Sequence, residues 1–172
     1  IQPVTAANRN CAAVWDILSN YGYRSHVIGW FVTHGERIPN GGVISNLYPA
    51  PPPATDKVRY PAPRGTYHPE EIAADLDALR VSPGDIGAET IHLFCPRFAE
   101  VDLQLDDRLK HLQVHLAEAF SIQAAACWTL ENREWDFLAV YFRAIDEIAH
   151  HFMPFHPPRL GGVPEREFEL YK

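Results

Sequence analysis

The chain has 172 residues and a formal net charge of −7, with 47% hydrophobic and 22% charged residues. This size and composition are typical of one folded globular domain with its own core, and they exclude a disordered chain. The acidic balance, with no dense run of Lys or Arg, argues against binding to a nucleic-acid backbone. No apolar stretch approaches the about 20 residues that a membrane span needs, so we expect a soluble chain, cytoplasmic or periplasmic.

The chain begins with Ile1 rather than Met, and its first residues do not resemble a secretion signal. We therefore expect a piece of a longer protein, which leaves the compartment and the formation of an oligomer open. The cysteines are Cys11, Cys95 and Cys127, far apart and without a Cys-x-x-Cys pair. This spacing predicts neither a disulfide framework nor a thiolate zinc site, and we expect three small buried apolar residues.

Residues 8–21 carry apolar side chains at helical spacing, followed by Gly22 as an expected C-terminal cap. The predicted buried face of this helix consists of Val14, Ile17, Leu18 and Tyr21. Residues 24–33 are rich in β-branched and aromatic side chains with little alternation, which is typical of a strand covered on both faces. A helix followed by a buried strand indicates an α/β layer.

Residues 34–65 contain repeated Gly and Pro, which fit neither a helix nor a central strand. We expect a long excursion over the surface here, leading into an inserted cap. Pro and acidic residues at 69–71 then predict the start of a helix whose apolar positions continue to Leu79. A second helix is predicted from Ala88 to Phe94, and Pro96 should end it.

From residue 106 to about 130, apolar positions step by three and four, which predicts the longest helix. A strand-like apolar run follows from Trp135 to Phe142. This order predicts an α/β fold with a partial, mainly parallel sheet flanked by helices and with an inserted helical cap. We divide the chain into two parts of the α/β core, 1–48 and 105–172, and a Pro-rich loop with the helical cap, 49–104.

Asp146 and His150 stand four positions apart just after this second strand. If residues 143–152 form a helix, the two side chains lie on one face about one turn apart, close enough to bind one cation. Open α/β sheets bind their ligands beyond the carboxyl ends of strands, which favours a metal site here. Glu147 is expected to be a solvated neighbour. His151 should point elsewhere, because one helical step turns by about 100°.

Two parts of the chain resemble bacterial type I phosphodiesterase/nucleotide pyrophosphatase proteins of the alkaline phosphatase superfamily. The first comprises stretches between Val14 and Asn46, and the second is Phe137–Phe152 with the Asp-x-x-x-His motif of Asp146 and His150. The resemblance implies part of an alkaline-phosphatase-like fold and two zinc ions, with Asp146 and His150 as ligands of one of them. It also implies a Thr or Ser nucleophile, a small phosphoester or nucleotide-like substrate, and an in-line displacement through a phospho-enzyme.

The nucleophile and the first metal-binding Asp of that family are expected before Ile1, and the family's Asp-His pair and final His after Lys172. The resemblance therefore describes this chain as a fragment of a zinc-dependent phosphoric ester hydrolase that contains no catalytic nucleophile and is inactive alone. Zinc binding should be weak or absent in such a fragment, because two protein ligands leave the other positions of the ion to water.

Two other interpretations stay open. In one, the chain is a noncatalytic interaction or regulatory α/β domain, in which Asp146 and His150 pair only with each other. In the other, it is an unrelated metallohydrolase whose further ligands include His34 and His156. The sequence contains no Gly-x-Ser-x-Gly elbow, phosphate-binding glycine loop, dinucleotide fingerprint or His-Glu-x-x-His pair, so it favours none of those enzyme classes.

Overall fold

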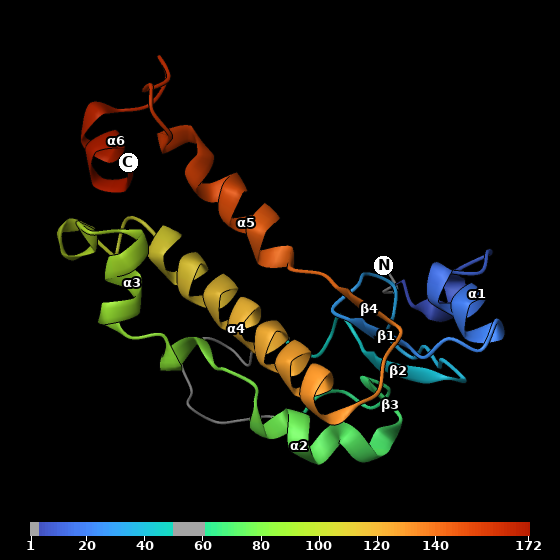
Figure 1. The fold of residues 1–172 in the computed structure, drawn as a ribbon. Helices are drawn as coiled ribbons and strands as arrows, with labels where there is room; N and C mark the ends of the chain where they lie inside the picture. The colour runs from blue at the N-terminus through green and yellow to red at the C-terminus, as the bar shows by residue number, and fades with distance from the viewer. Residues whose placement is uncertain (1–3, 50–60) are drawn as a thin grey trace. The chain divides into compact units, whose positions relative to one another are not determined.

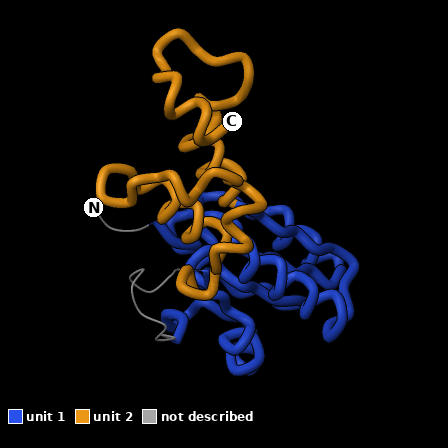
Figure 2. Tube along the Cα trace, turned by 90° about the vertical axis from the view of Figure 1, so that its left-hand side faces the viewer, with its two compact units in different colours: residues 1–50, 59–81, 119–142 blue, residues 51–58, 82–118, 143–172 orange. Residues whose placement is uncertain are grey.

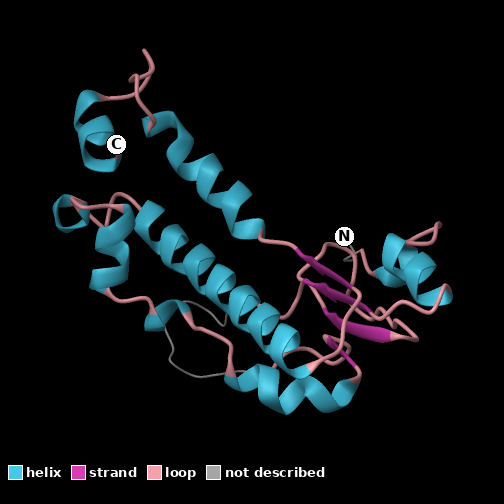
Figure 3. Cartoon of the chain, viewed as in Figure 1, coloured by secondary structure: helices cyan, strands magenta, loops and turns pink. Residues whose placement is uncertain are grey.

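A computed structural model describes residues 4–49 and 61–172 of the chain (Figure 1). The described residues form two compact units: residues 4–49, 61–81 and 119–142 belong to unit 1, and residues 82–118 and 143–172 to unit 2 (Figure 2). All strands of the described residues lie in unit 1, whereas the described part of unit 2 contains helices and loops (Figure 3).

The α-helices of the described residues vary widely in length. They are α1 (Val14–Asn20), α2 (Ala73–Ala78), α3 (Ala88–Phe94), α4 (Arg108–Asn132), α5 (Arg143–Phe152) and α6 (Glu165–Tyr171). Short 3-10 helices are η1 (Ala6–Asn8), η2 (Glu70–Ile72), η3 (Pro83–Asp85), η4 (Phe98–Glu100) and η5 (Met153–Phe155). None of the helices in residues 4–49 and 61–172 combines the length and apolar character that crossing a bilayer requires.

A four-stranded sheet in the order β3-β2-β1-β4 is the centre of unit 1. Its strands are β1 (Ser25–Ile28), β2 (Gly41–Ile44), β3 (Tyr67–His68) and β4 (Phe137–Val140). Strand β1 pairs in parallel with both β2 and β4, and the short β3 runs antiparallel to β2. The sheet is thus mixed but mainly parallel, and helices flank it, which confirms the predicted α/β class.

Successive side chains of the strands pack on opposite faces of the sheet, as the pleat requires. On one face, Val27 of β1 packs in a buried cluster with Trp15 of α1. On the other face, Ile28 packs in a second cluster with Leu76 of α2 and Ile122 of α4. Helices from three distant parts of the sequence therefore cover the two faces of β1, which explains why this strand is fully buried.

Strand β2 corrects the expectation that residues 34–65 form only a surface excursion. Gly41 pairs with Ser25 at the start of β1, and a Cβ atom at Gly41 would lie 1.8 Å from the Ser25 carbonyl oxygen. The glycines that suggested a loop are therefore required for the close approach of two parallel strands. Residues 50–60, which belong to the same predicted excursion, lie outside the described residues.

The two predicted strands are real but shorter than expected. Strand β1 ends at Ile28, because Gly29 takes a φ of 73° and the chain then turns. Strand β4 pairs with β1 along one edge, and its side chains are half-buried rather than fully buried. The lengths of the two apolar runs thus predicted strands that are longer than β1 and β4.

Helix α1 begins later than expected and presents a different face to the core. Its predicted cap is confirmed, because Gly22 has a φ of 88° and its N–H donates to the carbonyl oxygen of Ser19 at 3.0 Å. The predicted buried face is wrong, because Trp15, the largest apolar side chain of the helix, packs against the sheet instead. Val14 and Ile17 of the helix are exposed, and so is Tyr21 directly after it.

The helices of the second half match the sequence periodicity closely. Helix α3 has the predicted bounds, and α4 is the predicted longest helix, shifted by two residues at each end. Helix α5 supports the assumption that the segment after β4 is helical. Of the cysteines, Cys95 is buried as expected, but Cys11 and Cys127 are exposed.

Candidate metal centre

Asp146 and His150 lie side by side on α5. Oδ1 of Asp146 is 3.6 Å from Nε2 of His150, and the two side chains are 67% and 74% exposed. Their spacing of four residues places them one helical turn apart, as on any α-helix. The structure therefore brings together the two side chains that the sequence paired, in a position that solvent reaches freely.

The separation of the two ligand atoms suits one zinc ion. Tetrahedral zinc with oxygen and nitrogen ligands at about 2.0–2.1 Å keeps neighbouring ligand atoms about 3.3 Å apart. The distance of 3.6 Å between Asp146 and His150 differs from this value by a few tenths of an ångström. A small rotation of two exposed side chains closes that difference, so the residues present fit the metal that the family resemblance implies.

Glu147 does not belong to this pair. Nη2 of Arg143 lies 2.6 Å from its carboxylate, and Nε of Arg143 donates a hydrogen bond to it at 2.8 Å. The hydrogen bond from Arg143 holds the pKa of Glu147 below its usual value. Glu147 was expected to be a solvated neighbour, but its carboxylate is half-buried and paired with Arg143 within α5.

His151 turns away from His150, as its position on the helix predicted, and joins a group of histidines in unit 2. Its ring stacks on that of His111 of α4 with centroids 4.4 Å apart, and His115 lies one turn further along α4. Ligand nitrogens of the three residues all lie within 4.8 Å of one another. Burial lowers the pKa of His151, and charge on His111 and His115 lowers it further.

This histidine group was missed by the sequence analysis. One local signal was available, since His111 and His115 have the same four-residue spacing as Asp146 and His150. The contribution of His151 depends on the packing of α5 beside the start of α4, which no local pattern encodes. The group is therefore a feature of tertiary structure.

The other two histidines considered as ligands have different surroundings. His34 belongs to unit 1, where its Nδ1 is 3.4 Å from the hydroxyl oxygen of Ser45. His156 is exposed in unit 2. Within residues 82–118 and 143–172, the histidine group around His151 is the one set of three or more metal-binding side chains in close reach, and His156 is not part of it.

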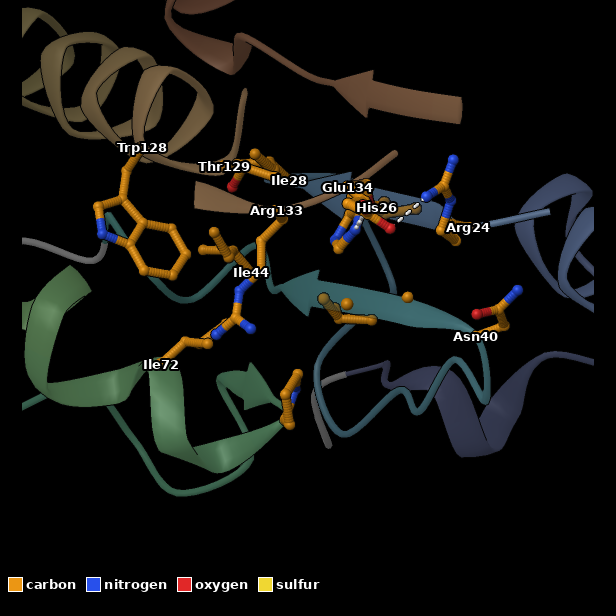
Figure 4. Close-up of a pocket in the computed structure, with 15 residues that line it drawn as sticks. Arg24, His26, Ile28, Asn40, Ile44, Ile72, Trp128, Thr129, Arg133 and Glu134 are labelled. Atoms are coloured by element: carbon orange, nitrogen blue, oxygen red, sulfur yellow. Dashed lines mark hydrogen bonds and ion pairs between the residues drawn. The ribbon is translucent and has the colours of Figure 1, made fainter. Parts of the chain in front are cut away.

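A pocket of about 210 Å³ opens beside the strands of unit 1 (Figure 4). It brings His26 of β1 together with Arg24 and Arg133, whose positive charges disfavour a metal cation. Nε2 of His26 lies 3.1 Å from the carbonyl oxygen of Glu134, and burial lowers the pKa of this histidine. The pocket is thus not a metal site of the kind that the sequence predicts.

The comparison with protein families gives a match that spans nearly the whole chain. The family model of type I phosphodiesterase/nucleotide pyrophosphatase matches residues 4–164, a range that includes the sheet of unit 1 and both Asp146 and His150. Neither a curated protein nor a solved structure matches the chain significantly. Because the match covers far more than half of the sequence, the chain belongs to the type I phosphodiesterase/nucleotide pyrophosphatase family, a family of metal-dependent phosphoester hydrolases.

Proposed function

We propose that the chain provides part of the metal centre of a zinc-dependent phosphoric ester hydrolase, with Asp146 and His150 as two ligands of one zinc ion. The observation that supports this function is the pairing of a carboxylate and an imidazole 3.6 Å apart on an exposed helical face within the family match. Oxygen and nitrogen ligands of this kind suit Zn²⁺, which accepts both.

The two side chains have different tasks in this proposal. Asp146 contributes a negative charge that offsets part of the charge of the cation, and His150 contributes a neutral nitrogen lone pair. Their exposure leaves room for a substrate oxygen beside them. A zinc ion bound there supplies a Lewis acid that stabilises negative charge on phosphoryl oxygens. The Arg143 contact keeps the neighbouring Glu147 occupied, so it does not compete with Asp146.

The substrate class that follows is a small phosphoester or a nucleotide-like molecule. The two-step route through a phospho-enzyme needs a Thr or Ser nucleophile and a second zinc ion in addition to the ligands Asp146 and His150. A protein of residues 1–172 alone is therefore proposed to bind zinc weakly at this pair, because water fills the remaining coordination positions. It is also proposed to be catalytically inactive, because Asp146 and His150 provide neither the nucleophile nor the second zinc ion.

The second candidate function is a noncatalytic interaction domain. It is favoured by the exposed apolar side chains of α1 and its C-terminal end, namely Val14, Ile17 and Tyr21. In this reading, the contact between Asp146 and His150 is an ordinary surface pair of little energetic weight. A catalytic assay separates the two candidates.

The experiment is hydrolysis of a phosphodiester and of a nucleotide pyrophosphate by the protein encoded by the complete reading frame, first stripped of metal and then reloaded with zinc. Mutation of a residue that only supports a metal ligand typically lowers activity about 10–100-fold. Asp146→Asn and His150→Gln should each lower turnover by more than this. Asp75→Asn and His92→Gln are matched controls, because both residues are exposed on other helices.

The controls should retain the turnover of the unmodified protein. Absence of zinc-dependent turnover in the unmodified protein would favour the interaction domain. Equal turnover in Asp146→Asn, His150→Gln and the controls would show that the reaction does not use this pair.

A further inference from the structure

Three histidines from two helices converge in unit 2 without a role in the proposed phosphoester chemistry. His111 and His115 belong to α4, one turn apart, and His151 belongs to α5. The centroids of the His115 and His151 rings are 6.2 Å apart, and those of the His111 and His151 rings 4.4 Å apart. One ligand nitrogen from each residue lies within 4.8 Å of the other two.

His115 is held in an orientation that suits a metal ligand. Its side chain is 7% exposed, and its Nδ1 is 3.1 Å from a carboxylate oxygen of Glu118, which is itself 10% exposed. A carboxylate accepts hydrogen bonds and cannot donate them, so Nδ1 carries the proton and Nε2 keeps its lone pair. In a metal-bound histidine, the ring nitrogen that does not bind the metal commonly donates its hydrogen to a carboxylate, which fixes the orientation of the ring.

The surroundings of His111 and His151 give the group a nearby negative charge and a side that solvent reaches. A carboxylate oxygen of Asp107 lies 3.4 Å from Nε2 of His111, whose side chain is 43% exposed. His151 is half-buried between this open side and the buried His115. The group is thus closed at one end and open to solvent at the other, which allows an ion to enter and a water molecule to complete its coordination.

We propose that His111, His115 and His151 form a metal site for a divalent transition-metal ion of the Zn²⁺ class, with water or Asp107 in the fourth position. Three imidazole nitrogens and one open position are a known arrangement for tetrahedral zinc. Neutral imidazoles do not suit hard cations, so Mg²⁺ and Ca²⁺ are excluded as the physiological ion.

Binding requires the ring stack to open. Zinc ligands at about 2.0–2.1 Å lie about 3.3 Å from one another, so ligand nitrogens that are now within 4.8 Å have to move closer together. The exposed His111 and the half-buried His151 can rotate, whereas Glu118 holds the buried His115. The metal would then tie the start of α4 to α5 and raise the stability of unit 2.

This site is separate from the Asp146–His150 pair. Adjacent residues of an α-helix differ by about 100° in direction, and His151 contacts His111 whereas His150 contacts Asp146. Loss of one site therefore leaves the ligands of the other in place. The inference does not rest on the proposed hydrolase function, and a protein without turnover can still confirm it.

The test measures the affinity of the 172-residue chain for Zn²⁺ by competition with a chromogenic chelator, and the visible spectrum of the Co²⁺ form. The background variant is Asp146→Asn, which removes the neighbouring pair. In that background, His111→Gln and His151→Gln should each weaken Zn²⁺ binding at least tenfold and abolish the tetrahedral Co²⁺ bands. Glu118→Gln should weaken binding about 10–100-fold, because it removes only the orienting acceptor.

His92→Gln is the matched control, because His92 is an exposed helical histidine of the same unit. It should bind Zn²⁺ as tightly as its parent. Circular dichroism confirms that each variant is folded, and the tests use His111 and His151 because His115 is buried. The proposal is overturned if the Asp146→Asn protein binds no Zn²⁺ at micromolar concentration, or if His111→Gln and His151→Gln bind it as tightly as His92→Gln.

Discussion

The pairing of β1 with β2 predicts an unusually large effect for Gly41→Ala. Gly41 has a φ of 154°, and a Cβ atom there would lie 1.8 Å from the carbonyl oxygen of Ser25. An ordinary contact is longer by about 1.5 Å, so the strands must separate at their first paired residues. Backbone strain of about 1–3 kcal/mol, one lost hydrogen bond and repacking of the buried strand together cost about 4 kcal/mol or more.

Gly22→Ala separates the clash from the cost of the backbone angle. Gly22 also has a positive φ, of 88°, but no atom lies within 4 Å of its added Cβ, so the expected cost is about 1–2 kcal/mol. The assay is urea unfolding followed by tryptophan fluorescence, because all four tryptophans lie in unit 1. A destabilisation of Gly41→Ala within 1 kcal/mol of that of Gly22→Ala would refute the parallel pairing that the argument assumes.

Two further predictions concern the same unit. Burial lowers the pKa of His26, so the unfolded chain binds the proton more tightly, and stability falls as the pH drops from about 6.5 towards the folded-state pKa. The wild type should therefore lose more stability than His26→Gln as the pH falls from 7.5 to 5, which urea unfolding measures. A difference in stability that stays constant over this range would contradict the prediction. Leu76→Ala should cost about 2–5 kcal/mol, because Leu76 is fully buried, whereas Leu93→Ala, at an exposed position of unit 2, should cost less than about 0.5 kcal/mol. Equal thermal unfolding temperatures for these two variants would show that Leu76 is not part of the core.

Helices could be predicted from this sequence because their signals are local. The bounds of α3 follow from its apolar spacing and from Pro96, and the long periodic run gave α4 to within two residues at each end. The face of α1 could not be predicted in the same way. Several apolar residues compete for burial on this short helix, and the shape of the sheet selects Trp15.

Strand β2 could not be predicted from its own residues alone. Gly41 and Gly42 weaken any strand signal, yet their missing side chains make room for Ser25 and His26 of the neighbouring strand. Whether a glycine pair marks a loop or a close strand contact depends on the partner strand. In this chain the partner precedes the pair by about 16 residues.

The two groups of candidate metal ligands differ in the same way, since one follows from local sequence and the other from tertiary packing. The contact between Asp146 and His150 follows from helical spacing alone, so the sequence was sufficient to place these side chains together. The group that contains His111 and His151 joins two helices, and its geometry follows from their packing. Reasoning on one helix placed His151 correctly away from His150 but could not identify its neighbour.

The central claim is that His150 is a ligand of a zinc ion beside Asp146. The most direct measurement is X-ray absorption at the zinc edge of the protein from the complete reading frame, in its unmodified form and as His150→Cys. A thiolate in place of the imidazole should add a sulfur neighbour at about 2.3 Å from zinc, whereas nitrogen and oxygen ligands lie at about 2.0–2.2 Å. A zinc environment in His150→Cys identical to that of the unmodified protein would contradict the account.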